Sequence, residues 1–408
     1  MEPLLFLAHR LPYPPNKGDK VRSCHFLRHL ASRYRVFLGA FIDDDSDHQH
    51  LDTVRRWCAE VHVETIVPWS RRVRSATAFL SGEPLTLPYF RSPSLQRWVR
   101  RVMQQEGITQ AFAFSSPMAQ YLLEFPQLRA IVDFVDLDSA KWGDYAARHA
   151  WPASSIYLRE ARRLLAYEQA VAARVQASVF VTDEEAQGFA AQTPQCSERV
   201  VIIQNGVDSD YFSPSKDFVN PFPRGERPIV FTGAMDYWPN VDAVVWFARE
   251  VLPQLIKVDP SVRFYVVGMN PDVAVRALAK DAATTVTGRV PDVRPYLQHA
   301  RVVVAPLRVA RGIQNKVLEA MAMGKAVVTT PACAAAIGAV KGQDLAVASE
   351  PQVFASQVRA LMDPAAAEQM GRYARQRITG SYAWPASFAR LDELLAGPHA
   401  ATAKAMAR

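Results

Sequence analysis

The chain has 408 residues, which at about 100–200 residues per domain predicts two or three domains. Apolar residues make up 49% and charged residues 21%, a balance that is typical of globular proteins and excludes an intrinsically disordered chain. The net charge is +7, and residues 216–408 hold the excess with 23 basic and 16 acidic side chains, whereas residues 1–215 carry 24 of each. This moderate excess suits an anionic small ligand or surface, and it lacks the dense basic runs of a nucleic-acid-binding tail.

We expect neither a secretory signal nor a membrane-spanning helix. Its start, MEPLLFLAHRLPYPP, has no basic region before the short apolar run, and no uninterrupted apolar stretch of about 18 residues follows. The four cysteines (Cys24, Cys58, Cys196 and Cys333) are far apart and form no C-x-x-C pair, which argues against a zinc site, an iron–sulfur site or a disulfide framework. We therefore expect a protein of the reducing cytoplasm.

Short apolar runs alternate with longer segments of helical period, which is the pattern of βαβ units and parallel sheets. The first half contains seven predicted strands, at Leu4–Ala8, Val36–Ile42, Val61–Val67, Gln110–Phe114, Ala130–Val135, Ser178–Thr182 and Arg199–Gln204. The second half contains six, at Ile229–Thr232, Arg263–Val267, Thr284–Thr287, Val302–Ala305, Ala326–Thr329 and Leu345–Ala348. The pattern predicts an α/β protein with two doubly wound, Rossmann-like domains.

The domain boundaries follow from composition. The segment 208–228, DSDYFSPSKDFVNPFPRGERP, has four prolines and no periodicity, so it predicts a linker between domains at 1–207 and 229–380. An amphipathic helix within 381–397 follows the last strand–helix unit and could return to the first domain. The alanine-rich tail 398–408 is predicted to be disordered.

The segment with the strongest indication of chemistry is VVVAPLRVARGIQNKVLEAMAMGKAVVTT, residues 302–330, in which a strand, a loop, a helix and a second strand follow one another. Ligands of open α/β sheets bind beyond the carboxyl ends of the strands, where helix N-termini offer free N–H groups to phosphate. Gly312 lacks a Cβ and would let a diphosphate approach, Lys316 would add positive charge, and Glu319 could accept hydrogen bonds from ribose hydroxyls. The spacing fits equally well a solvated Lys and Glu on an ordinary crossover helix.

Within this segment, GIQNKVLEAMAMGKAVV resembles the signature of the GT-B nucleotide-sugar glycosyltransferases, in particular the large retaining family 4, whose usual form is E-G-F-G-x-x-x-x-E-A-M-A-x-G-x-P-V-V. Three further segments resemble the family in the same order along the chain: NGVD (205–208), FTGAMDYWPNVDAV (231–244) and VTGRVPDVRPYL (286–297). Two N-terminal segments, HRLPYPPNKGDKVRSCHFLRHLA (9–31) and DFVDLDSAKW (133–142), most resemble the sugar transferases encoded with PEP-CTERM/exosortase exopolysaccharide systems.

The resemblance implies a GT-B fold, in which two Rossmann-like domains face a central cleft and the C-terminal helix crosses back to the N-terminal domain. It implies a hexosyltransferase-type enzyme that moves a sugar from a nucleotide-diphosphate sugar to an acceptor hydroxyl, with retention and without a metal or other cofactor. The N-terminal domain would bind the acceptor, a saccharide or lipid-linked saccharide of exopolysaccharide synthesis, and the C-terminal domain would bind the donor. Such an enzyme would work in the cytoplasm, at the inner face of the cell membrane.

The resemblance also assigns residues. Those that match donor-binding positions are Gly233, Arg289, Val290, Gly312, Ile313 and Glu319. Among them, Glu319 matches the ribose-binding position, and the backbone around Arg289 and Val290 would wrap the nucleotide base. A pure turn and capping role for that second segment remains open.

Two departures from the family pattern concern charge. Arg311 stands where the family has the first Glu of its signature, which contacts donor sugar hydroxyls, so the resemblance does not imply the identity of the sugar. The loop after the first strand of the second domain, residues 233–238, lacks the Arg and Lys with which many members neutralise the leaving diphosphate. Our hypothesis is that Lys316, with Arg311 beside it, supplies this electrostatic catalysis. The alternative is that Arg311 points to solvent or to a carboxylate.

In the first domain, Arg10, Lys17 and Gly18 follow the first strand, and Asp136 and Asp138 follow another strand whose end faces the same way. The resemblance places the first three beside the donor diphosphate and the acceptor, and either aspartate could bind an acceptor hydroxyl. A proline-stiffened surface loop is the alternative for the first group. Asp136-Leu137-Asp138 also matches the D-x-D motif that binds Mn²⁺ in GT-A enzymes, but those have one nucleotide-binding domain, so we expect no metal.

The stretch 69–101 has seven Arg and one Glu with five interleaved aromatic residues (Trp69, Phe79, Tyr89, Phe90 and Trp98). Basic residues with interfacial aromatics suit peripheral contact with an anionic membrane. No nucleic-acid-binding module accompanies them, so we expect no nucleic-acid partner. A solvated arginine face over a small core is the alternative.

Three other functions remain open. A nucleotide-sugar 2-epimerase uses the same fold and needs no acceptor. A degenerate transferase would bind the donor with little turnover. A bilobal sugar-binding protein without catalysis would normally carry an export signal and would not need the Arg and Lys of a diphosphate site.

Overall fold

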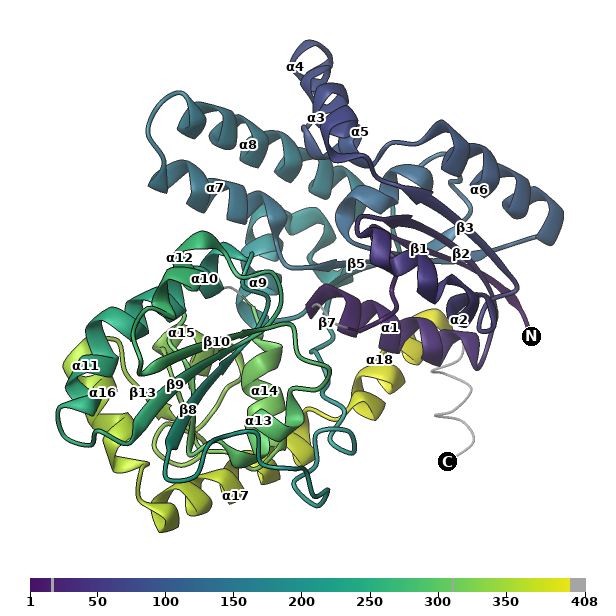
Figure 1. Ribbon diagram of the computed structural model, residues 1–408. Coiled ribbons are helices and arrows are strands. Elements are labelled where there is room, and N and C mark those ends of the chain that lie inside the picture. Colours follow the sequence, from purple (N-terminus) through teal and green to yellow (C-terminus); the bar gives the residue numbers. More distant parts are fainter. Residues whose placement is uncertain (16–17, 310–311, 397–408) are drawn as a thin grey trace. The chain divides into compact units, whose positions relative to one another are not determined.

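The computed structural model describes residues 1–15, 18–309 and 312–396, shown in Figure 1. The chain divides into two compact units, Met1–Gln204 with Ser387–Arg408, and Asn205–Ala386. The predicted site residues Lys17 and Arg311 and the predicted tail 398–408 lie outside the described residues.

The first unit is built on a seven-stranded sheet with the order β3-β2-β1-β4-β5-β6-β7, in which all neighbouring strands are parallel. Its strands are β1 (Pro3–Ala8), β2 (Arg35–Ile42), β3 (Glu60–Thr65), β4 (Gln110–Phe114), β5 (Arg129–Val135), β6 (Ala177–Phe180) and β7 (Val200–Ile202). The central strands are apolar almost throughout because helices cover both faces of a parallel sheet. All seven predicted strands are confirmed.

The helices of the first unit lie between these strands, and α7 and α8 run side by side (Figure 1). They are α1 (Gly18–Ala31), η1 (Asp45–His50), α2 (Leu51–Arg55), α3 (Pro68–Ala76), α4 (Ala78–Ser81), α5 (Thr86–Phe90), α6 (Pro93–Glu106), η2 (Ser116–Tyr121), α7 (Asp138–Arg148), α8 (Ala153–Ala172), α9 (Asp183–Gln192) and η3 (Pro194–Arg199). The sequence sets their ends locally: Ser92 accepts hydrogen bonds from the N–H groups of Ser94 and Leu95 at the start of α6, and Gly107 ends that helix in a left-handed conformation.

The second unit has a six-stranded parallel sheet with the order β10-β9-β8-β11-β12-β13. Its strands are β8 (Arg227–Thr232), β9 (Val262–Val267), β10 (Thr284–Gly288), β11 (Val302–Ala305), β12 (Val327–Thr329) and β13 (Ala346–Val347). All six predicted strands of the second half are confirmed, and the prediction of two doubly wound α/β domains is confirmed with them.

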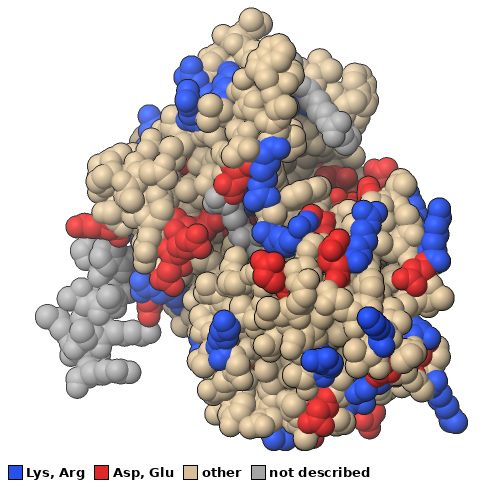
Figure 2. All heavy atoms as spheres, turned by 90° about the vertical axis from the view of Figure 1, so that its left-hand side faces the viewer, with Lys and Arg blue, Asp and Glu red and all other residues tan. Residues whose placement is uncertain are grey.

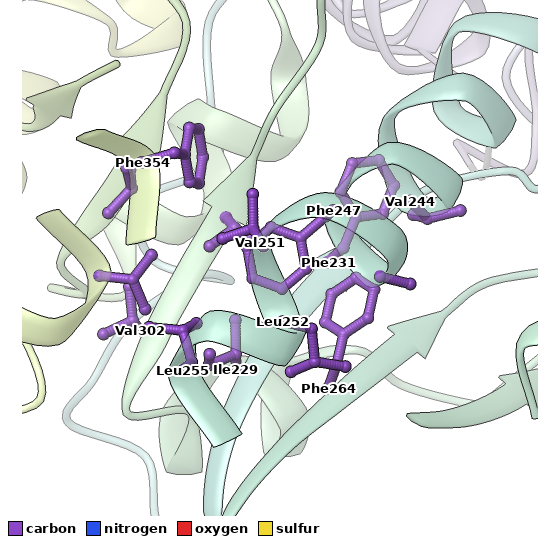
Figure 3. Packing of buried hydrophobic residues seen from close by; sticks show 14 of the residues in the cluster. Ile229, Phe231, Val244, Phe247, Val251, Leu252, Leu255, Phe264, Val302 and Phe354 are labelled. Atoms are coloured by element: carbon purple, nitrogen blue, oxygen red, sulfur yellow. The ribbon is translucent and has the colours of Figure 1, made fainter. Parts of the chain in front are cut away.

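The helices of the second unit follow the strands in the same alternating order (Figure 1). They are α10 (Trp238–Trp246), the π-helical η4 (Phe247–Val251), α11 (Leu252–Ile256), α12 (Val273–Leu278), α13 (Arg294–His299), α14 (Asn315–Ala322), α15 (Pro331–Ala336), α16 (Pro351–Ala360) and α17 (Pro364–Ser381). Figure 3 shows the core that they enclose, in which side chains from β8, β9, η4 and α16 meet. Phe247 is central to it, because its ring centroid lies 4.6 Å from that of Phe264 and 5.9 Å from that of Phe354.

The last described helix, α18 (Trp384–Ala396), begins in the second unit and continues in the first from Ser387 on. Its second part packs on α1: the Asp392 carboxylate lies 2.8 Å from Nε2 of His29, and the ring of Phe388 stacks on the His29 ring at 4.3 Å. Leu391 and Leu395 of this helix are buried. The predicted return of the C-terminal helix to the first domain is therefore present.

The proline-rich segment predicted as a linker lies within the second unit. Its backbone is fixed at Phe218, whose N–H donates to Oε1 of Gln298 at 2.9 Å and whose carbonyl lies 2.7 Å from Nε2 of His299. The buried ring of Phe222 packs on Tyr265 and Tyr296. These contacts give a segment without regular structure a defined place against α13 and β9.

All four cysteines are free. No helix in the described part of the chain is long and apolar enough to span a membrane.

Candidate functional site

The topology of the second unit determines where a ligand can bind. The strand order reverses between β8 and β11, and ligands of open α/β sheets bind at the carboxyl ends of the strands beside such a reversal. Gly233 follows β8, and the loop that contains Arg308 and Gly312 follows β11 and leads into α14. The sequence therefore folds its predicted donor-binding residues onto one edge of one sheet.

Gly233 forms a turn that only glycine can occupy. Its φ is +152°, and a Cβ built on it would lie 2.9 Å from Nδ2 of Asn240 and 3.2 Å from Cε of Lys316. A Cβ on Gly268, at the end of β9, would lie 1.6 Å from the Gly233 carbonyl oxygen. The absence of side chains at both positions lets the backbone after β8 pack directly against the end of β9 and brings Asn240 and Lys316 close to the Gly233 turn.

Lys316 brings a cation to this turn. It is the second residue of α14, and its ammonium group donates a hydrogen bond of 2.6 Å to Oδ1 of Asn240, whose amide donates in turn to the Ala234 carbonyl at 2.8 Å. The ammonium also lies 5.1 Å from the ring centre of Phe231, on β8. Burial lowers the pKa of Lys316 to about 8, although Cys333 and Glu319 act in the opposite direction. The loop after β8 has no cation of its own, and Lys316 lies directly beside it.

Glu319 follows Lys316 by about one helical turn on α14. Burial raises the pKa of its carboxyl group to about 7, and the positive charge of Lys316 opposes that increase. The carboxyl group can therefore gain or lose a proton near neutral pH, and a ligand hydroxyl that donates to it would favour the ionised form.

The start of α14 is held by residues from a distant part of the sequence. Nδ2 of Asn205 donates to Oδ1 of Asn315 at 3.2 Å, and the ring of Trp384 covers Gly206, where a Cβ would lie 2.5 Å from Cδ2 of that ring. Gly312 precedes the helix with φ of +66°, and Ile313 is buried. The NGVD segment therefore supports the helix end that carries Lys316.

Arg308, the other cation of the loop after β11, is held by an acidic partner. Its Nε lies 3.1 Å from Oδ2 of Asp242 on α10, and its guanidinium lies 5.8 Å from the ring centre of Trp246. Arg308 is therefore less available than Lys316 to a diphosphate.

Arg289 and Val290 follow β10 at the same edge of the sheet. Arg289 is exposed, and its Nη2 lies 3.6 Å from Sδ of Met269, which follows β9. Val290 is half-buried. Next to them, Asp292 accepts a 2.9 Å hydrogen bond from the N–H of Arg294, whose guanidinium it also binds. This arrangement fixes the turn and leaves Arg289 and Val290 available to a ligand.

In the first unit, Arg10 follows β1 and is paired with two carboxylates. Its Nη1 lies 2.7 Å from Oδ2 of Asp19, and its Nε lies 2.8 Å from Oδ2 of Asp43. Burial lowers the pKa of Arg10, but the two carboxylates outweigh it and raise the pKa above its usual value. Gly18 is the first residue of α1, directly before Asp19.

Asp136 and Asp138, which follow β5, share one cation. The ammonium group of Lys141 lies 2.7 Å from Oδ2 of Asp136 and 3.2 Å from Oδ1 of Asp138. Burial lowers the pKa of Lys141, and the two carboxylates outweigh it and raise the pKa well above its usual value. Across the described residues, no group of three or more His, Cys, Asp or Glu side chains is arranged to hold a metal ion.

Two features of these sites were not predicted from the sequence. The first is Asn240, which accepts a hydrogen bond from the ammonium group of Lys316. A buried polar residue in the largely apolar helix α10 is the sequence signal that could have identified it. The second is in the first unit, where Arg22 of α1 forms a buried ion pair of 2.7 Å with Asp133 of β5. This pair links the helix that follows the Arg10 loop to the strand that precedes Asp136 and Asp138. A buried ion pair between residues so far apart in the sequence has no local signal.

Residues 226–364 match the family model described as "Glycosyl transferases group 1". No curated protein sequence matches the chain.

Solved structures match over nearly the whole chain. Sucrose-phosphate synthase from Thermosynechococcus elongatus has a TM-score of 0.72 at 17% identity, covering 98% of this chain and 100% of its own. HepE from Anabaena, solved with UDP and glucose, has a TM-score of 0.65 at 13% identity, covering 97% and 99%. WaaG, a glycosyltransferase involved in lipopolysaccharide biosynthesis, has a TM-score of 0.66 at 14% identity, covering 97% and 100%.

At these identities the solved structures establish the fold alone, and the family model shows a similarity within the second unit. The two Rossmann-like units of the chain have the GT-B fold, and residues 226–364 are similar to the group 1 glycosyl transferases.

Proposed function

We propose that the protein is a glycosyltransferase that moves a sugar from a nucleotide-diphosphate sugar to an acceptor hydroxyl. The observation that carries the proposal is the position of the Lys316 ammonium group, 2.6 Å from Asn240 and beside the Gly233 turn, within the region that matches the group 1 transferase model. A departing nucleoside diphosphate gains negative charge at its leaving oxygen. A fixed cation at that point stabilises the transition state more than the bound donor.

The second unit would bind the donor. Glu319 would accept hydrogen bonds from the ribose hydroxyls, the backbone at Gly233, Gly312 and Ile313 would face the diphosphate, and Arg289 and Val290 would lie along the base. Lys316 would stabilise the leaving diphosphate, and Arg311, which lies outside the described residues, would assist it. The HepE structures contain UDP and UDP-glucose, so a uridine donor is the first to test.

The first unit would bind the acceptor through Arg10, Lys17, Gly18, Asp136 and Asp138. We propose a saccharide or lipid-linked saccharide of exopolysaccharide synthesis, transferred in the cytoplasm at the inner face of the membrane. The similarity of the fold to WaaG, a transferase of lipopolysaccharide biosynthesis, supports an acceptor of this class.

The signature GIQNKVLEAMAMGKAVV supports the finer assignment to retaining family 4, and the segments 9–31 and 133–142 support the PEP-CTERM/exosortase-associated subgroup. We propose hexosyl transfer with retention and without a metal. Lys316 would supply the positive charge at the diphosphate that a metal ion supplies in other transferases. The carboxylates of the D-x-D sequence are bound by Lys141. The departing phosphate oxygen would accept the proton of the attacking hydroxyl.

The test is thermal unfolding of the purified protein with UDP, GDP, ADP or dTDP, each with and without EDTA. A ligand that binds only the folded state raises the melting temperature by mass action. We expect one base to give a shift that EDTA does not change. The corresponding nucleotide sugar should then lose its sugar to a saccharide acceptor, with the same anomeric configuration in the product by NMR. Conversion of the nucleotide sugar without an acceptor would indicate an epimerase, and binding without turnover would indicate a degenerate transferase.

A further inference from the structure

Large apolar side chains are exposed on one part of the first unit. Apart from Met1, all those that the structure describes as exposed in this unit lie in two segments, 67–80 and 151–158. We call them the α3–α8 surface: Val67, Trp69, Val73, Phe79, Leu80, Trp151, Ile156 and Leu158. Trp69 is 71% exposed, Leu80 93% and Trp151 81%, so these side chains add nothing to the core.

The two segments form one surface because α8 packs against α4. The guanidinium of Arg159 donates to the carbonyls of Ala78 and Glu83, at 2.6 Å and 3.1 Å, and lies 4.9 Å from the ring centre of Phe79. Glu160 of α8 accepts hydrogen bonds from the backbone N–H groups of Leu85 and Thr86. These contacts hold the exposed apolar side chains of α3, α4 and α8 on a fixed frame.

The surface also carries positive charge. Arg148, Arg162 and Arg163 are exposed, and none of them forms an ion pair within the part of the chain that the structure describes. The two carboxylates where α8 meets α4 already have partners. Glu160 is buried and accepts hydrogen bonds from backbone N–H groups, and Glu83 forms an ion pair of 3.0 Å with Arg91. In Figure 2 the uppermost part of the visible face shows Lys and Arg side chains among uncharged residues.

This distribution differs from the sequence prediction for 69–101. Trp69 and Phe79 are exposed as that prediction requires, but Trp98 is buried against the sheet and Tyr89 and Phe90 are partly buried in the core of the first unit. Trp98 lies on the inward face of α6, where Nε1 of its indole donates to Glu60 at 2.6 Å. The stretch after residue 80 is therefore part of the folded unit, and residues 151–163 take its place on the surface.

We propose that the α3–α8 surface docks the protein on an anionic membrane. Exposed Trp, Phe and Leu side chains on short helices can enter the boundary between headgroups and acyl chains, and unpaired arginines bind anionic headgroups. The positive charge selects an anionic bilayer. This proposal does not rest on the transferase activity, because the surface contains none of the residues assigned to donor or acceptor.

The experiment is co-sedimentation of the full chain with vesicles of phosphatidylcholine, with and without phosphatidylglycerol. We expect binding to the anionic vesicles at low salt, at least tenfold weaker binding to the neutral ones, and weaker binding to the anionic vesicles as salt increases. The variant Trp69→Ser/Leu80→Ser should lower the partition coefficient at least tenfold. The variant Arg162→Gln/Arg163→Gln should lower it several-fold and reduce its dependence on salt.

Matched controls come from the second unit. Val219 and Val273 are 88% and 70% exposed, so Val219→Ser/Val273→Ser removes as many exposed apolar side chains elsewhere, and Arg249→Gln/Lys257→Gln removes two exposed cations. Circular dichroism and thermal unfolding check that every variant is folded. The proposal is overturned if the unchanged protein fails to sediment with anionic vesicles, as it would if the surface bound only another protein. It is also overturned if the control variants lose as much binding as the test variants.

Discussion

The ammonium group of Lys316 and the side-chain carbonyl of Asn240 are 2.6 Å apart at the carboxyl end of β8. Asn240 is buried and also donates to the Ala234 carbonyl, so it fixes the end of the lysine side chain relative to the strand. The cation missing from the loop at 233–238 is thus supplied from α14, by a residue that lies far along the sequence.

Replacing Lys316 by Ala should reduce kcat about 10²–10³-fold at saturating donor, the loss typical of removing one preorganised donor to a developing anion. Affinity for the nucleoside diphosphate should fall less, because backbone N–H groups still bind the phosphates. Steady-state kinetics and calorimetric titration of the diphosphate measure the two effects. Lys257→Ala, which removes an exposed cation of the same unit, should change neither. Unchanged turnover of Lys316→Ala would remove Lys316 from the mechanism.

Replacing Asn240 should act through Lys316. Asn240→Ala leaves the ammonium group without its acceptor, which should lower the pKa of Lys316 below about 8 and destabilise the fold by about 1–3 kcal/mol. If activity needs the ammonium form, the activity of Asn240→Ala should decline with rising pH at a lower midpoint than that of the unchanged protein. Asn240→Asp places a negative charge beside the ammonium and should move this loss to a higher pH.

The pH dependence of kcat/KM, measured from pH 6 to 10 for the three proteins, separates this role from simple damage. A merely structural asparagine would lower the rate at every pH and leave the midpoint where it is. Two variants with the same midpoint as the unchanged protein would contradict the positioning role.

The sequence was sufficient to predict the strands and the edge of the sheet that carries the candidate site. β-branched and leucine-rich runs, buried on both faces, determine β1, β8 and β11 directly, and the connections after β8 and β11 contain Gly233 and Gly312. Lys316 and Glu319 could be placed together because one helix carries them at fixed spacing, and Gly312 shortly precedes that helix.

Contacts between distant segments could not be predicted in this way. The partner of Lys316 depends on the packing of α10 against α14, and the place of the segment 208–226 depends on hydrogen bonds from Phe218 to α13. The aromatic residues near 69–101 show the same limit. Trp69 and Trp98 have similar basic neighbours, and only the packing of α6 on the sheet buries Trp98.

The pKa of Glu319 predicts how stability changes with pH. In the folded chain this pKa is raised to about 7, so between about pH 4.3 and 7 the folded state holds a proton that the unfolded state has lost. The stability associated with this proton is complete below that range and is lost as pH rises through about 7, by at most about 1.4 kcal/mol per pH unit.

Glu319→Gln should therefore become more stable relative to the unchanged protein as pH rises from 5 to 7. Urea unfolding at pH 5, 6 and 7 measures the difference. Glu250→Gln, at an exposed position of the same unit, should show no such trend. Parallel stability curves for the unchanged protein and Glu319→Gln would show that Glu319 titrates as an ordinary surface carboxylate.

The return of the C-terminal helix to the first unit predicts the cost of a distant substitution. Leu391 is fully buried on α18, so Leu391→Ala should leave a cavity beneath this helix and destabilise the chain by about 2–5 kcal/mol. Glu393→Ala, two residues further along the same helix, changes an exposed side chain and should cost less than about 0.5 kcal/mol. Urea unfolding followed by circular dichroism measures both. Equal and small effects would show that α18 does not contribute to the core of the first unit, because a helix docked only at its surface would tolerate both changes.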